Sequence, residues 1–282
     1  MTRTSEVQTA DRPRPAPAAP GAAASPLIRI EHVHKQFQNG TVAVRDMSLD
    51  IGEGQFVSFL GPSGCGKSTA LRMIAGLLSV SAGRITVDGH APGEGDSSQN
   101  VGFVFQDATL MPWTTVFDNV YLPLRLAGVS VEAARPRIGE ALSMVGLASF
   151  ADAYPRELSG GMKMRVSIAR AMVTRPRLLL MDEPFAALDE MTRAKLNDDV
   201  LRLWQEFGLT VIFVTHSVYE SVYLSNRVVV MAARPGRVVA DIPITAPYPR
   251  RQDLRNSAAY SESCAVVSEA LKATLGDVDG HE

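Results

Sequence analysis

The chain has 282 residues, of which 46% are hydrophobic and 21% are charged, a balance typical of a globular protein that buries a sizeable core. Its formal net charge of −2 lacks the basic excess that usually accompanies nucleic-acid binding. No uninterrupted apolar stretch approaches the roughly 18 to 20 residues that a membrane-spanning helix needs. Its 2 cysteines do not make a disulfide framework, so a reducing cytosol is the expected environment.

The two ends of the chain differ in composition from the middle. Proline and alanine dominate residues 11–26, which lack the leucine-rich core of a signal peptide, so residues 1–26 are predicted to be a disordered tail. A folded domain is expected over residues 27–245. Beyond it the sequence turns polar and is interrupted by proline, so residues 246–282 are expected to form a peripheral extension with one short helix over residues 262–275.

Two kinds of strand pattern predict the fold class. Turn signals separate three early segments that predict a small antiparallel sheet: residues 27–37, 42–51 and 83–88. Four later runs are short and almost continuously apolar, as in strands buried on both faces of a mostly parallel sheet: residues 101–105, 178–181, 211–214 and 228–231. Helical patterns lie between these runs, the clearest over residues 190–207. The alternation predicts an α/β fold, in which ligands bind at the carboxyl ends of the strands.

A glycine-rich loop follows the apolar run 56–60 and leads into a helical pattern. Its sequence matches G-x-x-x-x-G-K-[ST], and this strand–loop–helix context is typical of a phosphate-binding loop. Glycines allow the backbone N–H groups to point inward, and the helix adds the positive end of its dipole. Lys67 is predicted to reach the β- and γ-phosphates and Ser68 to bind Mg²⁺. The predicted nucleotide-binding residues of the loop are Gly61, Pro62, Ser63, Gly64, Cys65, Gly66, Lys67, Ser68 and Thr69.

The apolar run 178–181 ends in two carboxylates, Asp182 and Glu183. An unpaired charge at the tip of a buried strand is costly, so these acids are expected to serve a metal ion or a water molecule. Asp182 is predicted to hold Mg²⁺, and Glu183 to polarise the water that attacks the γ-phosphate. The alternative for Glu183 is an ordinary solvated loop acid.

Two further positions carry chemistry. Ser159 is a good helix N-cap, and Gly160 and Gly161 leave backbone N–H groups bare, so a second anion-binding helix start is predicted here. One triphosphate does not need two such helix starts, so the second is expected to complete the site of a neighbouring molecule. His216 ends the apolar run 211–215, and this place at a strand tip predicts contact with the γ-phosphate and, with Glu183, with the attacking water.

In this order the motifs resemble those of the ATP-binding cassette ATPases over residues 27 to about 237. The resemblance identifies the Walker A loop, the signature at 158–162, the Walker B acids, the D-loop at 187–189 and the switch histidine. It implies a RecA-like P-loop NTPase core with an antiparallel β subdomain and a helical signature subdomain at about 107–165. It further implies that Gln106 is a Q-loop residue at the metal and the reaction centre, that Phe37 stacks on adenine, and that ATP and Mg²⁺ are the cofactors. Two copies would close head-to-tail, as a homodimer with two identical sites.

Weaker features resemble one branch of that family, the importers of nitrate, sulfonate, taurine and related solutes. They are Met162 in place of a common glutamine, the segment 110–116 and the segment 228–237. The resemblance implies a peripheral ATPase subunit on the cytoplasmic face of the bacterial inner membrane. It would bind transmembrane permease subunits near residues 106–113, and a periplasmic or lipoprotein solute-binding protein would supply the solute. Related members handle heterocycles, so the solute stays open, and no nucleic-acid partner is expected.

Other functions are less consistent with the sequence. A cassette ATPase that acts on ribosomes or DNA would usually carry duplicated cassettes, long coiled-coil insertions or a basic face, and none is evident. A regulatory subunit with little turnover does not need Lys67, Asp182, Glu183 and His216 together. A phosphate-loop kinase or GTPase does not explain residues 158–162. The apolar residues 110–113 have an alternative role too, packing inside the helical subdomain.

Overall fold

Two β-sheets organise the protein, which a computed structural model describes over residues 25–94, 100–233, 235–250 and 252–276. The tail predicted for residues 1–26 therefore lies almost wholly outside the described residues. The smaller sheet is antiparallel, in the order β2-β1-β4. Its strands are β1 (Ile28–Gln36), β2 (Val42–Ile51) and β4 (Ala82–Val87).

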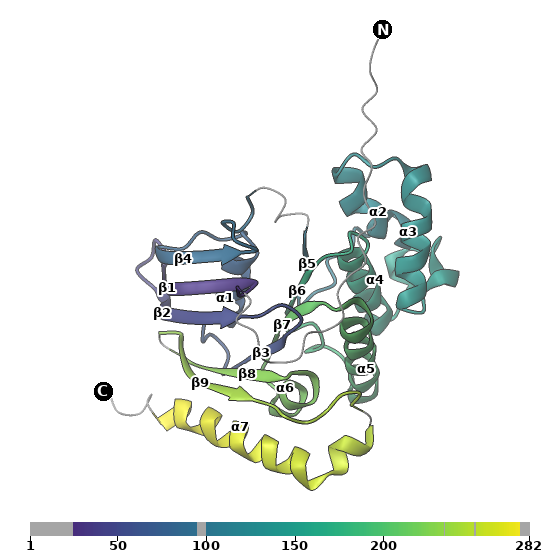
Figure 1. Cartoon of the computed structure of the whole chain (residues 1–282). Coiled ribbons are helices and arrows are strands. Elements are labelled where there is room, and N and C mark those ends of the chain that lie inside the picture. The colour runs from purple at the N-terminus through teal and green to yellow at the C-terminus, as the bar shows by residue number, and fades with distance from the viewer. Residues whose placement is uncertain (1–24, 95–99, 234, 251, 277–282) are drawn as a thin grey trace.

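The larger sheet is mostly parallel, in the order β5-β6-β7-β3-β8-β9. Only its edge strand β9 pairs antiparallel, with β8. Its strands are β3 (Phe56–Leu60), β5 (Val101–Val104), β6 (Leu178–Asp182), β7 (Thr210–Thr215), β8 (Arg227–Ala232) and β9 (Arg237–Pro243). Together with the antiparallel sheet and the surrounding helices, this arrangement confirms the predicted α/β fold class (Figure 1).

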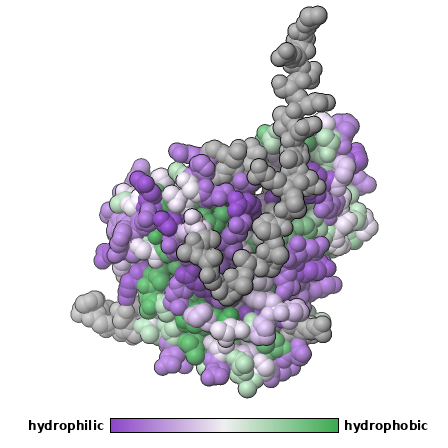
Figure 2. Space-filling view, in the orientation of Figure 1, coloured by the Kyte–Doolittle hydropathy of each residue, from purple (hydrophilic) through white to green (hydrophobic). Residues whose placement is uncertain are grey.

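Seven α-helices flank the sheets within the described residues. They are α1 (Lys67–Ile74), α2 (Val116–Leu126), α3 (Val131–Met144), α4 (Gly160–Met172), α5 (Glu190–Phe207), α6 (Val218–Leu224) and α7 (Ala258–Gly276). Figure 1 shows α2 and α3 grouped beyond α4, on the side of the molecule away from the antiparallel sheet. None of the helices in the described ranges combines the length and the apolar content that crossing a bilayer requires. Hydrophilic residues cover much of the face seen in Figure 2.

The predicted helix over residues 190–207 is confirmed with its boundaries. Asp189 caps its start by accepting a hydrogen bond from the backbone N–H of Thr192, with 2.9 Å between the heavy atoms. Gly208 ends it in the left-handed conformation, at φ 58°, which glycine adopts without the steric cost of a Cβ atom. Both boundary residues are local signals, so the sequence could specify where this helix begins and ends.

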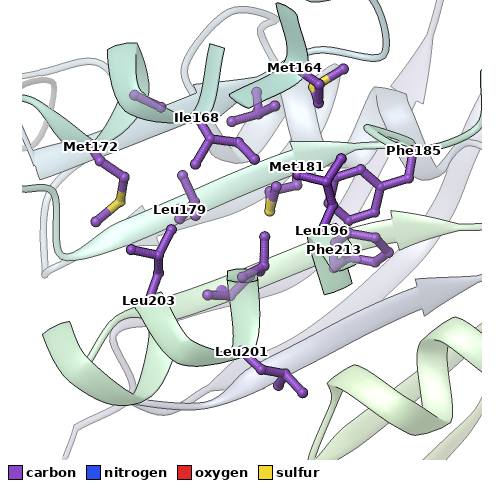
Figure 3. Packing of buried hydrophobic residues seen from close by; sticks show 14 of the residues in the cluster. Met164, Ile168, Met172, Leu179, Met181, Phe185, Leu196, Leu201, Leu203 and Phe213 are labelled. Atoms are coloured by element: carbon purple, nitrogen blue, oxygen red, sulfur yellow. The ribbon is translucent and has the colours of Figure 1, made fainter. Parts of the chain in front are cut away.

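The central strands of the large sheet are buried on both faces, and their side chains divide between two apolar cores. Leu179 and Met181 of β6 join a core with α4 and α5, which Figure 3 shows from close by. Leu178 and Leu180 point to the opposite core, beside α1 and the antiparallel sheet. This division follows from the two-residue repeat of a strand. It leaves the carboxyl ends of the strands as the places where the sheet can carry polar groups.

The C-terminal segment packs against α6, β8 and β9. Helix α7 begins at Ala258, earlier than the sequence indicated, because Tyr260 is buried and its hydroxyl donates to the carbonyl of Tyr219 at 2.9 Å. Ahead of α7, the buried guanidinium of Arg250 donates to the carbonyl oxygens of Val222, Tyr223 and Ser225 at the end of α6. The segment after residue 245 therefore holds α6 against the core.

We expect Phe213→Ala to lower the free energy of unfolding by about 3–5 kcal/mol, because it leaves a cavity in a close-packed core. Phe213 is 1% exposed and its ring lies 5.6 Å from that of Phe185 and 6.2 Å from that of Phe56. Denaturant titration followed by circular dichroism measures the change. Leu126→Ala is the control: Leu126 is 80% exposed, so its loss should change stability by less than about 0.5 kcal/mol. A Phe213→Ala cost below 1 kcal/mol, a magnitude usual for mild changes, would contradict this account of the core.

Candidate nucleotide site

The loop at 61–66 joins β3 to α1 and depends on glycine where the chain passes close to its neighbours. Gly66 has φ 89°, and a Cβ atom there would lie 2.6 Å from the carbonyl oxygen of Ala43. A Cβ atom on Gly61 would lie 2.4 Å from the carbonyl oxygen of Met231. No side chain caps the start of α1, so its first backbone N–H groups face the loop without a side-chain acceptor. This is the geometry that anions favour at a helix N-terminus.

Lys67 is held inside this loop. Its side chain is 3% exposed, and its ammonium donates to the carbonyl oxygens of Gly61 at 2.8 Å and Pro62 at 3.0 Å. Glu183 Oε1 lies 3.7 Å from Nζ, so a carboxylate partly balances the buried charge. The ammonium group is therefore fixed where the loop surrounds it, and it can exchange these contacts for phosphate oxygens.

Ser68 and Asp182 meet although they lie 114 positions apart in the sequence, with 2.6 Å between the serine hydroxyl and Asp182 Oδ1. Burial raises the pKa of Asp182, while the hydrogen bond from Ser68 and the nearby Arg72 act in the opposite direction. No group of three or more His, Cys, Asp or Glu side chains that could hold a metal occurs in the described residues. A hydroxyl and one carboxylate nevertheless suit Mg²⁺, which typically takes one or two carboxylates and completes its shell with substrate phosphates and water.

Glu183 lies between Lys67 and His216. Its Oε2 atom is 3.3 Å from His216 Nδ1, while its Oε1 atom faces Lys67. The backbone of Glu183 has φ 45°, a conformation uncommon for a residue with a side chain, and its N–H donates to the carbonyl of Val214 at 3.1 Å. Strained backbone of this kind clusters at functional sites.

The structure thus brings together five of the sequence-predicted residues at the ends of β3, β6 and β7: Lys67, Ser68, Asp182, Glu183 and His216. These strands are neighbours in the sheet, so their carboxyl ends meet at one edge. The arrangement can bind phosphates, hold a divalent cation and hold a water molecule between a carboxylate and an imidazole.

Other predicted residues lie apart from this group. Gln106, just beyond the end of β5, is exposed and makes no hydrogen bond to Ser68 or Asp182 in the described residues. Phe37, just beyond β1, is 40% exposed, and Lys35 Nζ lies 5.5 Å from its ring centroid. Ser159 caps α4 by accepting from the N–H of Met162 at 3.3 Å. In the part of the chain that the structure describes, no hydrogen bond or ion pair joins Ser159, Gly160 or Gly161 to the loop at 61–69.

Sequence reasoning missed two residues that support the loop. Gly236 packs so closely that a Cβ atom would lie 2.3 Å from the carbonyl oxygen of Cys65. Arg72, one turn into α1, places Nη2 3.9 Å from Asp182 Oδ2. Gly236 lies in the segment 228–237, which the sequence alone identifies. Its contact with the phosphate loop could not be predicted, because that contact depends on the tertiary fold. Cys65 itself is fully buried, and burial raises the pKa of its thiol.

Comparisons with known proteins agree with this geometry. The family model described as ABC transporter matches residues 44–186. The taurine import ATP-binding protein TauB of Rhizobium johnstonii is 44% identical over 255 residues, which cover 88% of this chain and 96% of that protein. The aliphatic sulfonates import ATP-binding protein SsuB of Bacillus cereus is 42% identical over 238 residues, or 83% and 92% of the two chains. A putative ATP-binding protein of Brucella abortus is 48% identical over 236 residues, which cover 84% and 90%.

Solved structures that are similar to this chain are also ATP-binding cassettes or parts of ABC transporter complexes. The cassette MJ0796, in a dimeric post-hydrolysis state bound to ADP and Pi, matches with a TM-score of 0.69 at 34% identity, covering 78% of this chain and 100% of that one. CbiO1 of Clostridium perfringens, part of the complex cbiONQ, matches with a TM-score of 0.72 at 25% identity, covering 87% and 100%. With the phosphate loop, the two acids and the histidine gathered at one edge of a mostly parallel sheet, these matches show that the chain belongs to the ATP-binding cassette transporter family and is an ATPase of that family.

Proposed function

We propose that this chain is the ATP-hydrolysing subunit of a bacterial importer for a solute of the nitrate, sulfonate or taurine type, or for a related small solute. The gathering of Lys67, Ser68, Asp182, Glu183 and His216 supports the ATPase chemistry. The similarity to proteins named for taurine and aliphatic sulfonate import supports the solute class. Transmembrane permease subunits would form the path, a periplasmic or lipoprotein solute-binding protein would deliver the solute, and the chain would lie on the cytoplasmic face of the inner membrane.

In this proposal each residue at the strand ends has one role. Lys67 and the backbone N–H groups of the loop bind the β- and γ-phosphates. Ser68 and Asp182 hold Mg²⁺, with Gln106 as a further ligand, and the ion neutralises phosphate charge when bound. Glu183 accepts a proton from the attacking water, and His216 holds that water with it. Phe37 stacks on the adenine ring.

We also propose that two copies of the chain close head-to-tail over two ATP molecules. Ser159 and Gly160 are exposed at the start of α4, while Gly161 is buried. Within the described residues, none of the three makes a hydrogen bond to the loop at 61–69 of the same chain. A second helix N-terminus is suited to the phosphates of a partner's nucleotide. The cassette structure at 34% identity, which is dimeric and bound to ADP and Pi, supports the formation of a dimer.

The segment after β5 is the proposed permease contact. Trp113 is 74% exposed, whereas Leu110 packs against the large apolar core, so the apolar residues of this segment divide between surface and interior. The buried side chain of Asn119 fixes the turn by accepting from the N–H of Met111 at 2.8 Å and donating to the carbonyl of Thr115 at 2.9 Å. A rigid turn that presents an indole ring to solvent is the kind of anchor that interfaces use.

Lys67→Ala should weaken ATP binding and hydrolysis together, because it removes the only lysine of the phosphate loop. The loss of one charge-assisted contact to phosphate is worth about 1.5–3 kcal/mol, or roughly 10- to 150-fold in affinity. Equilibrium binding of a fluorescent ATP analogue and release of inorganic phosphate measure the two effects. Affinity and turnover both near those of the unchanged protein would refute the assignment of the loop.

Glu183→Gln should bind ATP but lose most of its turnover. The amide keeps the shape of the side chain but cannot accept the proton of the attacking water, and loss of such a group typically costs about 10²–10⁴-fold in rate. The variant should also accumulate as an ATP-bound dimer, which light scattering coupled to size exclusion detects. Turnover within a few-fold of the unchanged protein would exclude Glu183 as the base. A monomer at saturating ATP would count against the proposed closure.

Affinity purification from detergent-solubilised native membranes, followed by mass spectrometry, tests the transport proposal as a whole. The expected result is a stoichiometric multi-span permease, whose solute-binding partner then narrows the solute. Trp113→Ala should reduce recovery of that permease, whereas Leu126→Ala removes an equally exposed apolar side chain elsewhere and should not. Recovery from the soluble fraction with ribosomal or DNA-repair proteins would overturn the proposal.

A further inference from the structure

An ion pair lies close to Glu183 and His216, and none of the family motifs described above includes both of its residues. Arg193, in the first part of α5, places Nε 3.7 Å from Glu220 Oε1 on α6. Both of these atoms are buried, and neither makes a hydrogen bond within the described residues. The two side chains make their hydrogen bonds through other atoms, Arg193 Nη2 and Glu220 Oε2, so the two facing atoms interact by charge without a hydrogen bond.

The pair and the proposed catalytic residues face one small cavity of about 10 Å³. Glu183 and His216 line this cavity, and Arg193 and Glu220 line it too. A space of this size is close to the smallest that can hold one water molecule. The four side chains are therefore neighbours around one small space.

Glu220 fixes the turn that carries His216. Its Oε2 atom accepts a hydrogen bond from the Thr215 hydroxyl at 2.6 Å, and the Thr215 oxygen accepts one from the N–H of Ser217 at 3.0 Å. The N–H of Glu220 in turn donates to the Ser217 hydroxyl at 3.3 Å. The residues on both sides of His216 are thus tied to Glu220, although Glu220 does not touch the imidazole.

Arg193 ties the other end of the pair to the turn at 187–189. Its Nη2 atom donates to the carbonyl oxygen of Leu188 at 2.9 Å, and its backbone N–H donates to that of Asp189. This turn lies at the surface: Asp189 is exposed, and Met191 just beyond it is 86% exposed. A displacement of the turn therefore acts on Arg193 directly, through these two hydrogen bonds.

We propose that Arg193 and Glu220 are positioning residues for ATP hydrolysis that couple the turn at 187–189 to His216. The inference rests on the role proposed above for His216. When the turn is displaced, Arg193 moves with Leu188, Glu220 follows Arg193, and Thr215 and Ser217 carry the displacement to His216. The pair sets where the imidazole stands relative to Glu183.

The test uses the full-length chain with Glu220→Gln and Arg193→Met, alone and together. Each single variant should lower kcat by roughly 10- to 100-fold, because small misplacements at a reaction centre cost this much. KM for ATP and the affinity for a fluorescent ATP analogue should stay within about twofold, since neither residue contacts the phosphate loop. The double variant should lose no more than either single variant, because the two residues act as one unit.

A spectroscopic readout separates positioning from a general loss of stability. The chain has 5 histidines, and ¹⁵N-histidine labelling with His216→Gln as the assignment variant identifies the His216 signal. Glu220→Gln and Arg193→Met should shift that signal and leave the others in place. Glu140→Gln is the matched control, because Glu140 forms an exposed pair with Arg175 at 2.7 Å, and it should change neither kcat nor the signal.

The inference is overturned if Glu220→Gln and Arg193→Met keep kcat within twofold, or if kcat falls while the His216 signal stays unshifted. If a single variant fails to fold, the double variant is used instead, because it leaves no unpaired buried charge. Its kcat and its His216 signal are then judged by the same two limits. His216→Gln gives a separate answer: full turnover in that variant would refute the proposed role of His216, whatever the pair does.

Discussion

Burial of the central strands on both faces is the constraint on which the rest of the structure depends. Every residue of β6 and of β7 is buried, so a charge within either strand would have no water and few partners. Asp182 is accommodated as the last residue of β6, where Ser68 donates to it and Arg72 lies 3.9 Å away. Within the central strands, charged groups are therefore found at the edge where β3, β6 and β7 end.

At that edge the charges compensate one another through a chain of contacts. Lys67 is enclosed by loop carbonyls and faces Glu183, and Glu183 in turn faces His216. The backbone of Glu183 is in the left-handed region, at φ 45°, and its carboxylate faces both neighbours. A positive group near the phosphates and a carboxylate beside it are preorganised before any ligand arrives, which is how a folded site lowers the cost of reorganisation during reaction.

The helices behind the edge extend this network toward the surface. Helix α6 follows the histidine directly, and it is held at one end by Glu220 and at the other by Arg250. The C-terminal segment thus contributes to the placement of α6 although it contains none of the sequence motifs. An isolated helix as short as α6, with 7 residues, has little stability of its own. Its position therefore depends on packing and on partners such as Glu220 and Arg250.

Sequence by itself determined the elements with strong local signals. The phosphate loop, the apolar strands that end in Asp182-Glu183 and in His216, and α5 between Asp189 and Gly208 were all predictable, because caps, glycines and apolar runs act within a few residues. Only the tertiary structure decided which distant groups meet. The contact of Ser68 with Asp182, the approach of Gly236 to Cys65, the pairing of Arg193 with Glu220 and the docking of α7 depend on strand order and helix packing. Those are set by the whole buried core, which no local pattern encodes.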